Sequence, residues 1–182
     1  ITQKRRIGRQ QKQLEEMAYH DPLTNLYTRH FFNETIKNEL FAIERYGHES
    51  VIILLDIDDF KDINDKYGHM AGDEVLVQLA KLVTDNVRKS DIVCRFGGDE
   101  FVILAPNNSI QAGVGLAEKL RGLINKNVFT VEQTTVRTTA SFGVSLLDVD
   151  QGHGNYFSKA DQALHTAKNS GKNRVDKIAN CV

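Results

Sequence analysis

The residues with the clearest chemical potential lie in a short stretch, 95–101, where Gly97 and Gly98 are followed by Asp99 and Glu100. Apolar, β-prone residues flank it, so the sequence predicts a strand, a glycine turn and a second strand. Glycine leaves space for a bulky anionic ligand beside the main chain. The two carboxylates would repel a phosphate there unless a divalent cation lay between them. The stretch therefore indicates Mg²⁺ and a nucleotide, with an exposed acidic turn as the alternative.

A second acidic group follows the apolar run at 50–55, which is typical of a strand buried on both faces. Residues 56–65 contain five aspartates and one lysine, which is costly crowding without a cation. If this strand and the hairpin are neighbours in one sheet, Asp56 faces Asp99 and Glu100. Such hard oxygen ligands suit Mg²⁺, and two ions of this kind can activate a hydroxyl and stabilise a leaving pyrophosphate.

The spacing of apolar residues predicts the elements that position these two groups. We expect helices over 31–46, 63–67, 72–83, 116–124 and 155–170, strands over 50–55, 92–94, 102–105, 128–131 and 136–145, and a short terminal strand. Helices between mainly hairpin-connected strands are typical of a mixed sheet with helices on its faces. The predicted fold class is therefore α/β (α+β).

Composition indicates an ordinary globular domain with a short extension. The 182 residues carry a formal net charge of -1, so no overall charge favours nucleic acid or an anionic membrane. The longest aliphatic run, 51–55, is too short to span a bilayer, and no signal peptide is visible. We therefore expect a cytoplasmic chain without a nucleic-acid partner. Because it begins with Ile1, we expect a longer parent protein with an upstream sensor, which could be membrane-anchored.

Residues 1–19 predict a polar helix ahead of the domain. Ile7, Leu14 and Met17 lie at spacings of seven and three. This weak heptad pattern suits the end of a signalling coiled coil, and a solvated linker is the alternative. The stretch 20–26 contains an Asp-Pro pair and breaks the helix. The predicted organisation is a helix at 1–19, a domain at 20–178 and a tail at 179–182.

Several motifs, in their order and spacing, resemble those of the GGDEF-domain diguanylate cyclases. They are DPLTNL at 21–26, DIDDFK at 56–61, ND at 64–65, GH at 68–69, GD at 72–73 and GGDEF at 97–101. The resemblance covers about residues 20 to 176. It implies a palm-like nucleotidyl cyclase fold with a central, mainly antiparallel sheet of five or six strands. It also implies an antiparallel homodimer that condenses two GTP molecules into cyclic di-GMP and two pyrophosphates.

The resemblance assigns roles to individual residues. For catalysis and metal binding it implies Asp56, Asp99 and Glu100 with the Ile57 carbonyl, and Mg²⁺ as the ion with Mn²⁺ able to substitute. For GTP it implies guanine contacts from Asn64 and Asp73, triphosphate contacts from Lys61, Lys168, Lys172 and the Phe60 main chain, and further contacts at Gly98 and His69. A carboxylate and an amide match the donors and acceptors of guanine and disfavour adenine.

Five of these assignments, those of Asp73, His69 and the three lysines, have a structural alternative. Asp73 lies near the predicted start of a helix, where an acidic residue favours the helix dipole. The three lysines could be ordinary surface charge, and His69 could be a structural histidine.

Two positions depart from the family pattern. His165 stands where tyrosine is usual, and we assign it no catalytic role. Lys172 stands where arginine is common. Lysine keeps the charge but lacks the two-pronged guanidinium, so we expect weaker affinity for the triphosphate.

The stretch 88–91 matches an RxxD pattern that precedes the hairpin motif by five residues. The resemblance implies that Arg88 and Asp91 bind cyclic di-GMP as an inhibitor, with Lys119 or Arg121 completing the site. A local ion pair between Arg88 and Asp91 is the alternative.

Two other functions stay open. One is a non-catalytic receptor for GTP or cyclic di-GMP that signals through the N-terminal helix, against which the intact GGDEF tip and Asp56 argue. The other is a cyclase whose product contains adenine, against which Asn64 and Asp73 argue.

Overall fold

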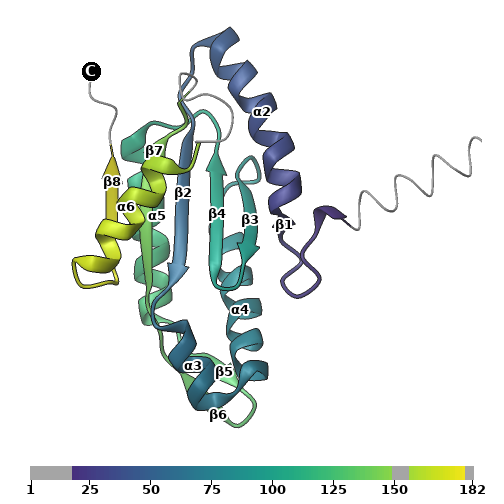
Figure 1. Cartoon of the computed structure of the whole chain (residues 1–182), viewed down its shortest axis with the longest axis vertical. Helices are drawn as coiled ribbons and strands as arrows, with labels where there is room; N and C mark the ends of the chain where they lie inside the picture. Colours follow the sequence, from purple (N-terminus) through teal and green to yellow (C-terminus); the bar gives the residue numbers. More distant parts are fainter. Residues whose placement is uncertain (1–17, 149–155, 179–182) are drawn as a thin grey trace, which may run out of the picture.

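A mixed sheet of six strands organises the computed structural model, which describes residues 18–148 and 156–178. In spatial order the strands are β1 (Tyr27–Thr28), β3 (Ile92–Gly97), β4 (Glu100–Ala105), β2 (Val51–Ile57), β7 (Ala140–Leu146) and β8 (Val175–Ile178). The four central strands are antiparallel, whereas β1 and β8 run parallel to their neighbours. The predicted fold, a mainly antiparallel sheet flanked by helices, is confirmed (Figure 1).

Two pairs of helices cover the two faces of this sheet (Figure 1). One face packs against α2 (Arg29–Tyr46) and α6 (Ser158–Asn169), and the other against α4 (His69–Thr84) and α5 (Ile110–Lys126). A shorter helix, α3 (Phe60–Tyr67), follows β2 directly, and a small hairpin of β5 (Phe129–Val131) and β6 (Thr134–Val136) lies at the same end (Figure 1). No described helix is long and apolar enough to cross a membrane.

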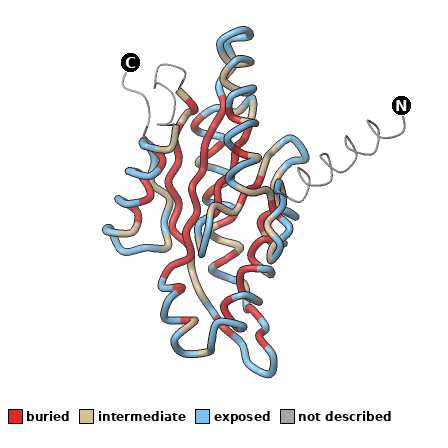
Figure 2. The backbone as a smooth tube through the Cα atoms, turned by 45° about the vertical axis from the view of Figure 1, so that its right-hand side comes forward, coloured by how far each residue is buried: buried red, intermediate tan, exposed pale blue. Residues whose placement is uncertain are grey.

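Strand β2 is buried along its whole length because both faces are covered (Figure 2). Val51, Ile53 and Leu55 contribute to the core under α4 and α5, and Ile52 and Leu54 to the core under α2 and α6. A fully buried aliphatic side chain contributes about 1.5–3 kcal/mol. The continuous apolar run therefore anchors the strand, and the acidic residues that follow it are held at a defined edge.

One glycine sets the position of α6 over the sheet. A Cβ at Gly143 of β7 would lie 2.0 Å from the Ala160 carbonyl oxygen and 2.4 Å from the Leu164 nitrogen, both in α6. A glycine in a strand interior often marks such a close backbone approach. The helix can therefore lie directly on β7, with its last turn beside the carboxyl end of β2.

Several predicted boundaries were wrong. The single strand expected at 136–145 is two strands, β6 and β7, which belong to different sheets and are separated at 137–139. The Thr138 and Thr139 hydroxyls in this gap donate to Asp58. Helix α4 begins at His69 rather than at 72, and α5 begins at Ile110, where the Ser109 side chain caps it. The predicted helix at 1–19, except for residues 18 and 19, and the tail at 179–182 lie outside the described residues, so the domain division stays a prediction.

Candidate active site

The carboxyl end of β2 lies beside the tip of the β3–β4 hairpin. Strand β2 pairs with β4 in antiparallel register, with Leu55 opposite Phe101 and Asp56 opposite Glu100. The adjacency that we expected between the two acidic groups is therefore confirmed. The register places Asp56 at the sheet edge where the GGDEF turn closes.

The hairpin turn depends on its glycines and on an arginine that we did not predict. Gly97 and Gly98 have φ of 154° and 50°, which residues with a Cβ adopt rarely. The register shifts between Arg95 and Gly97, as in a β-bulge. Arg95 donates from Nε and Nη2 to the Gly98 carbonyl oxygen at 3.0 and 2.8 Å. Its guanidinium therefore holds the turn.

Arg95 also joins the turn to the DPLTNL motif. Its Nη1 donates to Asp21 Oδ2 at 3.0 Å, and the same oxygen accepts from the Thr24 N–H at 2.8 Å and from the Thr24 hydroxyl at 2.7 Å. Burial raises the pKa of Asp21, but the bonds from Thr24 and Arg95 outweigh burial and lower it. Two motifs separated by 74 residues thus form one structure. Arg95 itself lies in the hairpin motif, but nothing local in the sequence identifies its partner.

Asp56 is a buried carboxylate with a raised pKa. It is 9% exposed, and Lys168 Nζ donates to its Oδ1 at 2.5 Å. Burial raises the pKa of Asp56 to about 6, and repulsion from Asp99 and Glu100 adds to the shift against the opposing effect of Lys168. Within residues 18–148 and 156–178, no group of three His, Cys, Asp or Glu side chains could hold a metal ion by itself. Any ion at this edge therefore needs ligands beyond these side chains.

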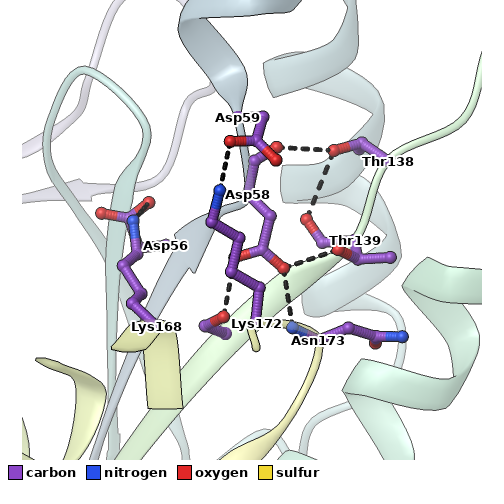
Figure 3. A network of polar contacts seen from close by, with 9 residues as sticks. Asp56, Asp58, Asp59, Thr138, Thr139, Lys168, Lys172 and Asn173 are labelled. Atoms are coloured by element: carbon purple, nitrogen blue, oxygen red, sulfur yellow. Dashed lines mark hydrogen bonds and ion pairs between the residues drawn. The ribbon is translucent and has the colours of Figure 1, made fainter. Parts of the chain in front are cut away.

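The second predicted lysine lies on the same edge. Lys172, in the loop between α6 and β8, donates to Asp59 Oδ1, and this bond raises the pKa of Lys172 (Figure 3). Lys168 lies in the last turn of α6, the helix that can pack closely on the sheet because residue 143 is a glycine. The two lysines are therefore brought together with the acidic residues after β2. His165 is exposed, and its Nε2 lies 2.8 Å from Asn169 Nδ2.

The residues proposed to contact guanine lie where α3 and α4 meet. A Cβ at Gly72 of α4 would lie 2.0 Å from Asn64 Oδ1 of α3, so the absence of a side chain at 72 leaves room for the Asn64 amide. Asp73 follows and is exposed. Lys61 and His69 are also exposed, near the amino ends of α3 and α4. The predicted helix start at 72 was wrong, so Asp73 lies in the second turn of α4 and not at its cap.

The RxxD residues form a tight turn beside a pocket of about 350 Å³. Asp91 Oδ2 accepts from the Arg88 N–H at 2.8 Å, and Asp91 Oδ1 is buried without a hydrogen-bond partner. Arg88, Asp91 and residues of the 20–27 segment line the pocket. Lys119 Nζ donates to the Asn86 carbonyl at 3.0 Å, next to this turn. Arg121 is directed elsewhere, to Asn173 at 3.1 Å.

The sequence over residues 18–174 matches the family model described as diguanylate cyclase, GGDEF domain. The chain belongs to this family. It is 38% identical over 161 residues to diguanylate cyclase DgcP of Pseudomonas aeruginosa, covering 88% of this chain and 24% of that protein. It is 35% identical over 167 residues to diguanylate cyclase A of Treponema denticola, covering 90% of this chain and 45% of that protein. The chain thus spans less than half of these GGDEF relatives.

Solved structures of GGDEF proteins have the same fold. The coiled coil and GGDEF domain of DgcB from Caulobacter crescentus, in complex with c-di-GMP, has a TM-score of 0.89 at 26% identity, covering 97% of this chain and 94% of that one. Diguanylate cyclase SiaD of Pseudomonas aeruginosa, in complex with its activator SiaC, has a TM-score of 0.84 at 30% identity, covering 98% and 68%. The predicted family and fold are therefore both confirmed.

Proposed function

We propose that this chain is a diguanylate cyclase domain that condenses two GTP molecules into cyclic di-GMP and two pyrophosphates. The observation that carries the proposal is the register of Asp56 against Glu100, which puts the carboxylates of β2 and of the GGDEF turn at one sheet edge. Lys168 and Lys172 stand at the same edge. A nucleotidyl transfer needs this combination of hard oxygen ligands and cations around a triphosphate.

GGDEF cyclases generally need a divalent metal ion, and the residues at this edge fit one. We propose that Asp56, the Ile57 carbonyl, Asp99 and Glu100 hold Mg²⁺, or Mn²⁺ in its place, together with phosphate oxygens of GTP. The raised pKa of Asp56 reflects burial and neighbouring like charges, which a cation would offset. When bound, the ion would polarise the α-phosphate and stabilise the leaving pyrophosphate.

The chain's own groups bind and orient the nucleotide in this proposal. Lys168 and Lys172 exchange their carboxylate partners for phosphate oxygens, and Lys61 with the main chain at Phe60 adds contacts at the amino end of α3. Asn64 and Asp73 recognise the guanine edge between α3 and α4, where Gly72 leaves room for the amide. Glu100, which is exposed, can accept the proton of the attacking 3′-hydroxyl.

Two domains must cooperate, since the product needs two 3′-hydroxyls to attack two α-phosphates. One sheet edge of this kind holds one GTP, so we propose an antiparallel homodimer with one nucleotide at each facing half-site. The helix predicted at 1–19 would raise the local concentration of paired domains. An upstream sensor in a longer parent protein would then control activity by arranging the pair.

We also propose that cyclic di-GMP inhibits the enzyme at the RxxD turn. Asp91 Oδ1 is a buried acceptor without a partner, and guanine N–H groups would satisfy it. Arg88 is exposed and can bind a phosphate, with Lys119 nearby. We expect Arg88→Ala to raise the concentration of cyclic di-GMP that halves the rate at least tenfold. Unchanged inhibition in steady-state assays would contradict this site.

Product analysis tests the proposed function. The protein is incubated with GTP and Mg²⁺ at low and high protein concentration, with Asp99→Ala as the control. We expect cyclic di-GMP from the wild type alone, with specific activity rising as dimers form. No product at any concentration, with retained binding of cyclic di-GMP, would instead favour the receptor function. A product containing adenine from mixed ATP and GTP would contradict the guanine assignment of Asn64 and Asp73.

A further inference from the structure

Asp58 is a buried carboxylate that takes no part in the proposed chemistry. It is 4% exposed and lies two residues after Asp56. Its Oδ1 accepts from the Ser141 hydroxyl at 2.6 Å, and its Oδ2 accepts from the Thr139 hydroxyl at 2.5 Å and from the Asn173 N–H at 2.9 Å (Figure 3). A buried carboxylate is tolerated where hydrogen bonds satisfy it. The three bonds join the end of β2 to β7 and to the loop between α6 and β8.

That loop has an unfavourable backbone conformation. Gly171, Lys172 and Asn173 have φ of 113°, 62° and 45°. Left-handed angles are disfavoured for residues with a side chain, and two in succession need support from the surrounding structure. The hydrogen bond from the Asn173 N–H to Asp58 provides one support. A second is the hydrogen bond that Arg121 Nη1 donates to Asn173 Oδ1 at 3.1 Å. The Lys172 N–H donates to the Ala167 carbonyl at 3.1 Å.

The loop conformation determines where Lys172 points. Its side chain reaches Asp59, on the edge where Lys168 contacts Asp56 (Figure 3). If Asn173 relaxed to a negative φ, the chain would change direction at Asn173, and the preceding Lys172 would no longer be held with its ammonium group at this edge. We propose that Asp58 is a positioning residue, which holds the left-handed loop so that Lys172 is available to the triphosphate of GTP. This inference rests on the proposed function.

A double-mutant cycle of Asp58→Ala and Lys172→Ala tests the proposal. For each variant, steady-state kinetics give the GTP KM and kcat. A binding titration gives the Kd of a non-reacting GTP analogue that has a methylene between the α- and β-phosphates. We expect Asp58→Ala to raise the GTP KM and the analogue Kd about tenfold, with a smaller change in kcat. In a Lys172→Ala background, Asp58→Ala should add less than about threefold. A full tenfold addition would contradict the proposal, because Asp58 would then act independently of Lys172.

Asp58→Asn separates hydrogen-bond geometry from charge. Its amide oxygen can accept from Thr139 and Asn173 as Oδ2 does, while its amide nitrogen donates to the Ser141 hydroxyl, which rotates to accept. We therefore expect this variant to stay within about threefold of the wild-type KM. A KM as high as that of Asp58→Ala would overturn the positioning role. If Asp58→Ala does not fold, Asp58→Ser takes its place in the cycle, since a hydroxyl and a water can fill the site without restoring the bond to Asn173.

Ser50→Ala is the matched control, because it removes a buried hydrogen-bonding group at the opposite end of β2. It should lower the unfolding temperature without changing KM, and a KM shift as large as that of Asp58→Ala would attribute the effect to general destabilisation. The behaviour of the wild type distinguishes a failure of the proposed function from a failure of the positioning role of Asp58. A wild type without turnover or analogue binding would refute the proposed function, whereas an active wild type with additive Asp58 and Lys172 effects would refute this inference alone.

Discussion

The polar groups at the two ends of β2 have different surroundings. At the amino end, the buried Ser50 hydroxyl donates to Glu39 Oε1 at 2.5 Å and accepts from the Asn107 N–H at 3.2 Å, while His48 Nε2 lies 2.8 Å from the same glutamate oxygen. At the carboxyl end, Asp56 is held near Asp99 and Glu100, with Lys168 as its hydrogen-bond partner. At the amino end the buried polar atoms have hydrogen-bond partners, whereas at the carboxyl end three carboxylates lie near one another.

Left-handed backbone is found at both ends but is more frequent at the carboxyl end, since at the amino end Asn107, whose N–H bonds Ser50, has φ of 52°. Asp59, Lys172 and Asn173 have φ of 55°, 62° and 45°, and all three lie around the carboxyl end of β2. Strained residues that persist are held by the surrounding structure and cluster at functional sites. We infer that the amino end contributes stability, whereas the carboxyl end gives up stability for metal and nucleotide binding.

The largest expected effect is on activity at the carboxyl end. Asp56→Asn keeps the shape of the side chain but removes the charge that would hold the metal, so we expect kcat/KM for GTP to fall at least about a thousandfold, roughly 4 kcal/mol. Initial rates of pyrophosphate release at saturating Mg²⁺ would measure it. Activity within tenfold of the wild type would show that the carboxylate at this position is dispensable.

The same variant should be more stable than the wild type at neutral pH. The pKa of Asp56 is raised from 3.8 to about 6 in the folded protein. Stability that is present below pH 3.8 is therefore lost as the pH rises through 6, by about 3 kcal/mol for a shift of this size. We expect the unfolding free energy of Asp56→Asn, relative to the wild type, to increase from pH 4 to pH 7. Urea titrations without divalent ions would show it, and a pH-independent difference would refute the raised pKa.

Ser50→Ala should have the opposite balance. It leaves the Asn107 N–H without its partner and leaves Glu39 Oε1 with His48 alone, so we expect a loss of about 1–3 kcal/mol of unfolding free energy. The amino end is remote from the proposed chemistry, and kcat/KM should stay within twofold. Thermal unfolding and GTP kinetics on one preparation would check both. A large kinetic defect in a folded Ser50→Ala would remove the contrast between the two ends.

The smallest expected effect concerns Lys172. An arginine there can bind phosphate through two parallel N–H groups, so Lys172→Arg should lower the GTP KM about two- to fivefold with little change in kcat. Steady-state kinetics over a wide range of GTP would resolve this change. An unchanged or raised KM would mean that the lysine does not limit triphosphate affinity.

Local patterns were enough to predict the hairpin and the buried strand β2, and the motifs were enough to identify the family. A two-glycine turn between apolar strands and a continuous apolar run each have one favoured structure. Helix starts were less predictable because capping by Thr28 and Ser109 extends α2 and α5 beyond their apolar faces. The single strand expected at 136–145 was wrong because its first part pairs with β5 and its second part with β2, and a local pattern does not identify these partners.

The candidate site could also be predicted only in part, because local patterns do not reveal partners that are distant in sequence. The composition of 56–61 indicates an acidic edge, but it does not distinguish Asp56, with its raised pKa, from Asp58, which three hydrogen bonds satisfy. The bond from Arg95 to Asp21 and the approach of α6 to Gly143 depend on partners distant in sequence. The glycine inside a strand was an available signal for the second of these.

Metal-dependent stabilisation tests the central claim most directly. The unfolding temperatures of the wild type and Asp56→Asn are compared with the non-reacting GTP analogue, with and without Mg²⁺. We predict that Mg²⁺ raises the unfolding temperature of the wild type by several degrees, whereas Asp56→Asn, more stable at the start, gains almost nothing from the ion. Equal stabilisation of both proteins by Mg²⁺ would contradict the claim that the carboxyl end of β2 is built for metal and nucleotide.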